Sequence, residues 1–291
     1  MPKDPASRAS AEWLEHFADF SSRYDIALCD IWGVVHNGVT AWPAACDALT
    51  RFRERGGRVA LITNAPRPSD KVQSMLTRLA VPDSVRDVIV SSGDITRGEI
   101  AAHDGARIFH LGPGRDLSLF EGFNVTRVGA DDAELIVNTG LFDDDDETPD
   151  DYRDLLAGFA GRGLRMVCAN PDIVVERGDR LVYCAGALAD LYESLGGDVL
   201  WAGKPHAPIY ARALEELGCR DIPRGRCLAI GDSIRTDMRG AEDYGVDALF
   251  IAGGIHAGEM GGRDSSVAGR LQAAFDEAGV APKAVMGALA W

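Results

Sequence analysis

Short apolar runs alternate with amphipathic stretches along most of the chain. In the first third, two such runs are each followed by a stretch with apolar residues at helical spacing. A strand buried on both faces of a sheet reads as a continuous apolar run, and its alternation with helices is typical of parallel sheets with right-handed crossovers. We therefore predict strands at residues 26–29 and 59–62 and helices at residues 44–55 and 69–79.

The same pattern restarts in the middle of the chain and returns to its first form near the end. Further strands are predicted at residues 88–90, 107–110, 135–137, 166–168, 199–201, 227–230 and 248–251, and helices at residues 96–103, 151–161, 208–217 and 236–244. We interpret this as an α/β protein whose Rossmann-like parallel-sheet core is interrupted by an inserted α/β domain. The predicted parts are a leader at 1–22 with one helix near residues 11–20, a core at 23–81 and 197–291, an insertion at 82–196 and a surface loop near residues 261–266.

Polar side chains follow four of the predicted strands at the points where the strands end. They are Asp30, Thr63, Asn64, Lys204, Asp232, Ser233 and Asp237. In open parallel sheets, ligands collect beyond the carboxyl ends of the strands, so we expect these groups to converge at one edge. Carboxylates suit Mg²⁺, and a lysine, a hydroxyl and loop amides suit a phosphate group. The sequence therefore predicts a magnesium-dependent site for a phosphate ester, in which Asp30 attacks phosphorus.

Net charge and cysteine content further limit the class of protein and its expected location. The 291 residues carry a net charge of −15, and such a surface repels nucleic acid and anionic lipid. The six cysteines form no CxxC pair and three of them lie inside apolar runs, so we expect reduced thiols and a cytoplasmic protein. The N-terminal segment is too charged for a signal peptide, and no apolar run approaches the ~20 residues needed to span a bilayer.

Five motifs in order along the chain give a resemblance to a known family. They are Asp30-Ile-Trp-Gly-Val-Val-His-Asn-Gly38, Thr63-Asn64, Asn170-Pro-Asp172, Gly203-Lys-Pro205 and Gly231-Asp-Ser-Ile-Arg-Thr-Asp237. With them, the chain resembles the haloacid dehalogenase superfamily of aspartate-nucleophile phosphatases, and within it the class IIA, NagD-like branch. The resemblance covers about residues 25–251. It implies a C2-type α/β cap that closes over the core and selects a small phosphorylated metabolite, and it allows a homodimer formed through the cap.

The resemblance also implies a role for each site residue. Asp30 matches the nucleophile and a Mg²⁺ ligand, and Trp32 would supply its backbone carbonyl as a second ligand. Asp232 matches the acidic metal ligand. The remaining matches are Thr63 and Asn64 in the phosphate-binding loop, Lys204 as the cation that holds nucleophile and phosphate together, and Asp237 with Ser233 as groups that support Asp232.

Trp32 departs from the family pattern, which has a second aspartate two residues after the nucleophile. That aspartate protonates the leaving oxygen and later activates water, whereas an indole donates one hydrogen bond and does not titrate. General acid–base help is typically worth ~10²–10⁴-fold in rate. Three alternatives remain open: the substrate has a good leaving group, another residue such as His36 or a cap residue supplies the proton, or the chain binds phosphorylated ligands with little turnover. We expect His36 itself to be an exposed loop residue, and the acidic run at 143–147 to be a solvated loop.

Two other activities share parts of this pattern. Receiver-like signalling domains also pair an aspartate with acidic metal ligands, but the length and the inserted domain argue against them. Dehalogenases of the superfamily lack the second aspartate, but they need no Mg²⁺. Because Asp232 and Asp237 are both present, we favour phosphate chemistry.

Overall fold

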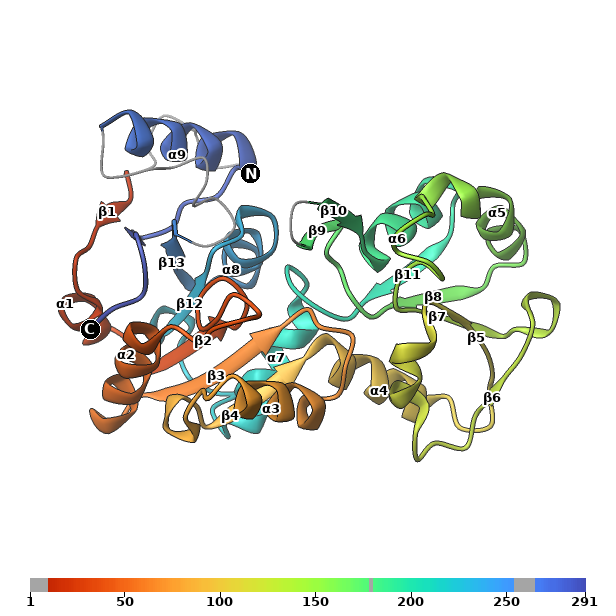
Figure 1. Ribbon diagram of the computed structural model, residues 1–291, viewed down its shortest axis with the longest axis horizontal. Coiled ribbons are helices and arrows are strands. Elements are labelled where there is room, and N and C mark those ends of the chain that lie inside the picture. Colours follow the sequence, from red (N-terminus) through yellow and green to blue (C-terminus); the bar gives the residue numbers. More distant parts are fainter. Residues whose placement is uncertain (1–9, 178–179, 254–264) are drawn as a thin grey trace. The chain divides into compact units, whose positions relative to one another are not determined.

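The computed structural model describes residues 10–177, 180–253 and 265–291. The chain divides into two compact units (Figure 1). The core unit comprises the chain up to Thr63, residues 73–90 and the chain from Pro205 onward. The inserted unit comprises residues 64–72 and 91–204. Each unit is built on its own parallel sheet.

In the described residues, the core unit contains a seven-stranded sheet with the order β1-β14-β13-β12-β2-β3-β4. The strands are β1 (Glu12–Trp13), β2 (Ile26–Asp30), β3 (Arg58–Thr63), β4 (Val88–Ser91), β12 (Cys227–Gly231), β13 (Asp247–Ile251) and β14 (Ala284–Met286). The central strands β2 and β12 are buried along their whole length, as expected for continuous apolar runs in a sheet covered on both faces. The helices of this part of the chain are α1 (Phe17–Ser21), α2 (Pro43–Glu54), α3 (Ser69–Arg78), α7 (Ala207–Glu216), α8 (Arg239–Tyr244) and α9 (Ser265–Ala278).

The inserted unit contains a five-stranded parallel sheet with the order β11-β8-β7-β5-β6. Its strands are β5 (Arg107–Leu111), β6 (Thr126–Arg127), β7 (Leu135–Asn138), β8 (Arg165–Cys168) and β11 (Asp198–Trp201), and its helices are α4 (Ser92–Ala102), α5 (Arg153–Gly161) and α6 (Ala185–Ser194). A separate antiparallel pair consists of β9 (Val174–Arg177) and β10 (Arg180–Tyr183). Successive residues of β7 join different apolar clusters, Ile136 on one face and Leu135 with Val137 on the other. Both faces of this sheet are therefore buried, which is why its strands also read as apolar runs.

The parallel α/β architecture agrees with the sequence prediction, but several elements differ. The helix predicted near residues 11–20 is wrong in its first half, because Glu12–Trp13 forms a strand that pairs with β14. The run at 88–90 is an edge strand of the core sheet rather than part of the insertion. The run at 199–201 pairs with β8 in the inserted unit's sheet. Helix α9 and strand β14 were not predicted, and most of the predicted loop at 261–266 lies outside the described residues.

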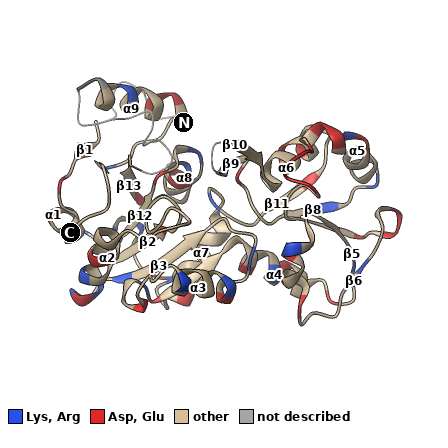
Figure 2. Cartoon of the chain, in the orientation of Figure 1, with Lys and Arg blue, Asp and Glu red and all other residues tan. Residues whose placement is uncertain are grey.

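The acidic segment at 143–147 is mostly an exposed loop, as predicted, but two of its side chains are held by contacts with the rest of the inserted unit. The Tyr152 hydroxyl donates to Glu147 at 2.5 Å and accepts from the Phe142 amide at 2.7 Å. Arg115 pairs with Asp144, whose side chain is only 6% exposed. Figure 2 shows acidic positions along α5 and the chain beside it. None of the described helices is both long enough and apolar enough to cross a membrane.

A polar relay lies at the carboxyl end of β5 in the inserted unit. The Nε2 atom of His110 is 3.0 Å from the Thr139 hydroxyl, and Thr139 in turn hydrogen-bonds the buried carboxylate of Asp116. Burial, assisted by the charge of Arg127, lowers the pKa of His110 from 6.5 to about 4. The imidazole is therefore neutral in the folded protein over a pH range in which the unfolded chain protonates it.

This depressed pKa makes His110 a source of acid sensitivity. The unfolded state binds more protons than the folded state between about pH 6.5 and pH 4, so the stability that neutral His110 contributes is complete above pH 6.5 and is lost as the pH falls toward 4. As the pH falls from 6.5 to 4, we expect the free energy of unfolding to decrease less in the His110→Gln variant than in the parent. The two decreases should differ by on the order of 2 kcal/mol. Urea unfolding of both proteins at each end of the range measures the difference, with His103→Gln as the control. Equal losses in the parent and the His110 variant would contradict the assignment.

Candidate active site

The register of the core sheet fixes the surroundings of Asp30. Asp30 ends β2 and pairs with Ile62 of β3, so Thr63 lies one step further along the neighbouring strand. On the other side, Cys29 pairs with Ile230 of β12. Asp232 therefore follows the end of β12 beside the end of β2. The carboxyl ends of three adjacent strands bring these groups to one edge, as the sequence pattern predicts.

Three buried carboxylates meet at this edge. Asp30, Asp232 and Asp237 each offer an oxygen, and these oxygens all lie within 4.8 Å of one another. Their relative exposures are 8%, 1% and 2%. Three carboxylates this close repel one another in a poorly solvated site, unless a cation or protons compensate them. The donor set consists of hard oxygen atoms and suits Mg²⁺ or Ca²⁺.

Two glycines let the backbone approach these carboxylates. Gly33 has φ +80°, and a Cβ built on it would lie 1.9 Å from Oδ2 of Asp232. A Cβ on Gly231 would lie 2.1 Å from the Cγ of Asp237. Side chains at either position would fill the space that the carboxylates occupy. The loop after Asp30 and the end of β12 are thus shaped around the acidic groups, which is the second observation that favours a cation site.

Asp237 lies in a single π-helical turn, Ile234–Met238. Ser233 caps this turn by accepting a hydrogen bond from the Thr236 amide at 3.3 Å, and its own amide donates to Oδ2 of Asp237 at 3.2 Å. The wider turn of a π-helix often occurs at functional sites. Here it turns Asp237 back over the loop that carries Asp232 and Ser233.

Asn64 and Lys204 are held together by reciprocal hydrogen bonds. The Lys204 amide donates to Oδ1 of Asn64 at 2.7 Å, and Nδ2 of Asn64 donates to the Lys204 carbonyl and to Oδ1 of Asp172, both at 3.0 Å. Gly203 is required for this contact, since a Cβ there would lie 2.4 Å from the Asn64 amide oxygen. Lys204 itself is only 2% exposed. The Asn170-Pro-Asp172 turn therefore has a structural role, because it helps to fix Asn64.

Trp32 and His36 occupy the loop after Asp30. The indole is 49% exposed, and its ring meets the His36 imidazole edge-on with centroids 5.5 Å apart. Gly38, with φ +87°, lies directly under the indole, because a Cβ there would be 2.3 Å from the ring. The indole is thus fixed on one side and open on the other.

The prediction that His36 is exposed is wrong. Its side chain is fully buried, and burial lowers the pKa of the imidazole. The loop folds back on itself, since the amides of Val35 and His36 both donate to the Ile31 carbonyl. Nδ1 of His36 accepts a hydrogen bond from the Gly38 amide at 2.8 Å, so the neutral ring carries its proton on the enclosed Nε2. In this arrangement His36 is poorly placed to act as a general acid.

The chain is similar to known proteins in both sequence and structure. A family model described as haloacid dehalogenase-like hydrolase matches residues 27–126, and one described as HAD-hydrolase-like matches residues 201–274. The crystal structure of a haloacid dehalogenase-like hydrolase from Brucella suis is 45% identical, covers 95% of this chain and 99% of its own, and has a TM-score of 0.79. Ribonucleotide monophosphatase NagD from Escherichia coli is 27% identical over 78% of this chain and 87% of its own length. The structure of glycerol phosphate phosphatase from Mycobacterium tuberculosis in complex with calcium is 24% identical, covers 81% of this chain and 68% of its own, and has a TM-score of 0.61.

These matches show that the chain belongs to the haloacid dehalogenase-like hydrolases. Its relatives include NagD and other phosphatases, so the resemblance to the NagD-like phosphatase branch is confirmed. The predicted fold class, a Rossmann-like core with an inserted α/β domain, is confirmed as well.

Sequence reasoning did not identify the glycines that stand close to the predicted site residues in each unit. Gly33, Gly203 and Gly231 stand beside predicted site residues, and their close approach to side chains distant in sequence gives the reason for glycine at each place. Each of these glycines belongs to one of the five motifs. The sequence does not show, however, which side chains lie next to each glycine in the folded protein. The groups at the carboxyl end of β5 were also missed, although the same strand-end rule points to His110.

Proposed function

We propose that this protein is a Mg²⁺-dependent phosphatase that hydrolyses small phosphorylated metabolites through an aspartyl-phosphate intermediate. The observation that carries this proposal is the convergence of Asp30, Asp232 and Asp237 within 4.8 Å at the carboxyl edge of the core sheet. One member of such a set can act as nucleophile while the others hold a cation. We propose a cytoplasmic location and no nucleic-acid or membrane partner, in keeping with the net charge of −15, and a homodimer through the inserted unit as the assembly to test.

Asp30, Asp232 and the backbone carbonyl of Trp32 would hold the metal. When bound, Mg²⁺ neutralises charge on the phosphate oxygens and on the carboxylates around it. The Ser233 amide donates a hydrogen bond to Asp237 and supports its carboxylate. The loop at Gly33 packs closely against the carboxylate of Asp232 and limits its position.

In the proposed reaction, a carboxylate oxygen of Asp30 attacks phosphorus, and the P–O bond to the ester group breaks. The leaving oxygen departs as an anion that takes its proton from water. Water then attacks the aspartyl-phosphate, which regenerates the Asp30 carboxylate and releases inorganic phosphate. We assign the Thr63 hydroxyl and the Asn64 amide to binding of phosphate oxygens, and the Lys204 ammonium to charge neutralisation. We assign substrate selection to the inserted unit, as the cap.

Removing the metal is expected to reduce phosphate release by roughly 10²-fold or more, because the carboxylates would then repel the substrate. The measurement is phosphate release from 4-nitrophenyl phosphate, acetyl phosphate and glycerol phosphate, with EDTA and after Mg²⁺ is restored. Asp232→Asn should raise the Mg²⁺ concentration needed for half-maximal rate, whereas the exposed Asp243→Asn should not. Equal rates in EDTA and in Mg²⁺ would rule out the metal-dependent mechanism.

A second candidate function is binding of phosphorylated ligands with little turnover. The half-exposed indole of Trp32, at the place of the family's acid–base aspartate, favours it. Rapid multiple turnover of any one ester by the parent protein would exclude this candidate. Tight phosphate binding without turnover on every ester tested would support it.

A further inference from the structure

The sheet of the inserted unit has its own topological switch point. The chain moves from β5 outward to β6, then crosses to the other side of β5 to form β7, and continues to β8 and β11. In open parallel sheets such a reversal opens a crevice beyond the carboxyl ends of the two strands concerned, and ligands bind there. The two strands here are β5, which ends at Leu111, and β7, which ends at Asn138.

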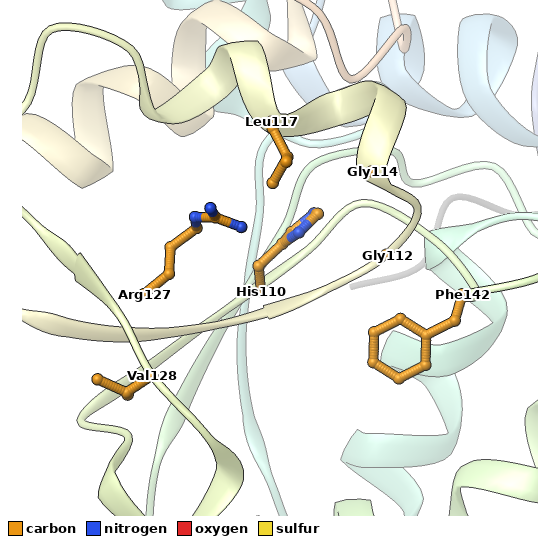
Figure 3. A pocket seen from close by; sticks show the side chains of 7 residues that line it. All are labelled: His110, Gly112, Gly114, Leu117, Arg127, Val128 and Phe142. Carbon is orange, nitrogen blue, oxygen red and sulfur yellow. The ribbon is translucent and has the colours of Figure 1, made fainter.

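A pocket of about 410 Å³ lies at this point. Its lining residues come from the ends of β5 and β6 and from the segments that follow β5 and β7: His110, Gly112, Gly114, Leu117, Arg127, Val128 and Phe142. Arg127 pairs with Ile108, two residues before His110, so the pleat places Arg127 and His110 on the same face. Figure 3 shows these two side chains rising on the same side of the β5 ribbon, with Leu117 above them, whereas the Phe142 ring lies on the other side of that ribbon.

His110 forms the polar wall of the pocket, and hydrogen bonds between side chains hold it in place. Asp116 is 2% exposed, and as a carboxylate it accepts the Thr139 hydroxyl proton, so the Thr139 oxygen accepts from Nε2 of His110. This leaves Nδ1 of the neutral imidazole as a hydrogen-bond acceptor. Gly112 has φ +149°, and a Cβ there would lie 2.0 Å from the Thr139 hydroxyl oxygen and 3.1 Å from Nε2 of His110. Glycine at this position therefore leaves room for the hydrogen-bonded side chains of His110 and Thr139. The glycines of the core unit leave room for the carboxylates there in the same way.

The other two walls offer charge and apolar surface. In the described part of the chain, no carboxylate lies within ion-pair distance of Arg127, although the protein as a whole is strongly acidic. Phe142 is 47% exposed, and it is supported edge-on by Phe109 with ring centroids 6.4 Å apart. The pocket thus offers an unpaired guanidinium on one side and an exposed, supported aromatic ring on the other, which matches a ligand with an acid group at one end and a flat apolar group at the other.

We propose that this pocket binds a small aromatic acid, with the acid group on Arg127 and the ring against Phe142 and Leu117. The acid group is a carboxylate or a phosphate, which share the charge and the planar pair of acceptor oxygens that a guanidinium recognises. A hydroxyl or amino group on the ligand donates to His110. The site does not depend on the proposed phosphatase reaction, because none of its residues belongs to the carboxylate cluster of the core unit.

Calorimetric titration of the full chain with benzoate and with phenylphosphonate tests this site. Neither probe is a phosphate ester, so neither is consumed. We expect saturable binding of at least one of them, weakened roughly tenfold or more by Arg127→Gln and also weakened by Phe142→Ala. Arg107→Gln is the matched control, since Arg107 lies on the neighbouring strand and is engaged by Glu134. Asp30→Asn should leave the affinity unchanged.

The affinities of the two probes identify the preferred acid group. Absence of saturable binding by both probes would overturn the proposal, as would equal affinities in the parent and in Arg127→Gln. Binding that disappears in Asp30→Asn, or that inorganic phosphate with Mg²⁺ displaces, would place the probes in the core site instead. A failure of phosphate release by the parent protein would leave these binding results intact, so the two proposals stand or fall separately.

Discussion

Replacing Asp30 with asparagine is expected to reduce phosphate release by roughly 10⁴-fold or more, because an amide does not form the phosphorylated intermediate. The change removes one negative charge and keeps the shape of the side chain. Asp30 pairs with Ile62 through its backbone at the end of the central strand β2, so the strand itself should remain in place. Loss of rate without loss of folding is therefore the expected result, measured as phosphate release together with the urea midpoint.

The intermediate provides an independent readout. Rapid quenching of the parent protein with acetyl phosphate should yield a chain heavier by one phosphoryl group, and peptide mapping should place it on Asp30. The Asp30→Asn variant should show no such species, whereas Asp19→Asn, an exposed change on α1, should behave as the parent. Phosphate release by Asp30→Asn at the parent's rate would refute the nucleophile assignment.

Replacing Trp32 with aspartate should have the opposite effect and raise the turnover of alkyl phosphates by ~10²–10⁴-fold. The indole cannot protonate a leaving alkoxide or deprotonate water, and the alternative His36 is buried and neutral with its Nδ1 already bonded. The gain should be largest for glycerol phosphate, whose leaving group needs a proton. It should be smaller for 4-nitrophenyl phosphate, whose leaving group departs as a stable anion.

Pre-steady-state kinetics show which step the indole limits. With 4-nitrophenyl phosphate the parent should give a burst of nitrophenol followed by a slow phase, because water must attack the aspartyl-phosphate without a general base. Trp32→Asp should abolish the burst by accelerating that second step. Trp32→Asn, which matches the new side chain in size but does not titrate, is the control and should keep the slow phase. A fast parent and an inactive Trp32→Asp would mean that another group transfers the proton.

The central strands were predictable because their signal is local. Strands β2, β3 and β12 contain continuous apolar runs, and each ends at or just before a polar residue that the rule of parallel sheets brings to the same edge. The sheet order and the register then place Asp30 and Asp232 near each other without further information. The grouping of these two acids with Asp237 was therefore available from the sequence.

The structural features that could not be predicted depend on contacts that the local sequence does not specify. Strand β1 has two residues and exists through pairing with β14, more than 270 residues later, so its local sequence favoured a helix. The runs in β4 and β11 suit either sheet, and their apolar pattern does not say which neighbours they will have. His36 lies in a loop with ordinary loop composition, and its burial follows from the way that the loop returns to Ile31.

Residues 32 and 33 are neighbours in sequence but differ completely in their tolerance to redesign. The indole of Trp32 leaves half of its surface open, so a library aimed at new substrates can vary this position widely. Gly33 meets Oδ2 of Asp232 at a distance that admits no methyl group, and its φ of +80° excludes most other residues. Directed evolution of this loop should therefore randomise the first position and leave the second untouched, although the proposed chemistry uses no side-chain atom of either residue.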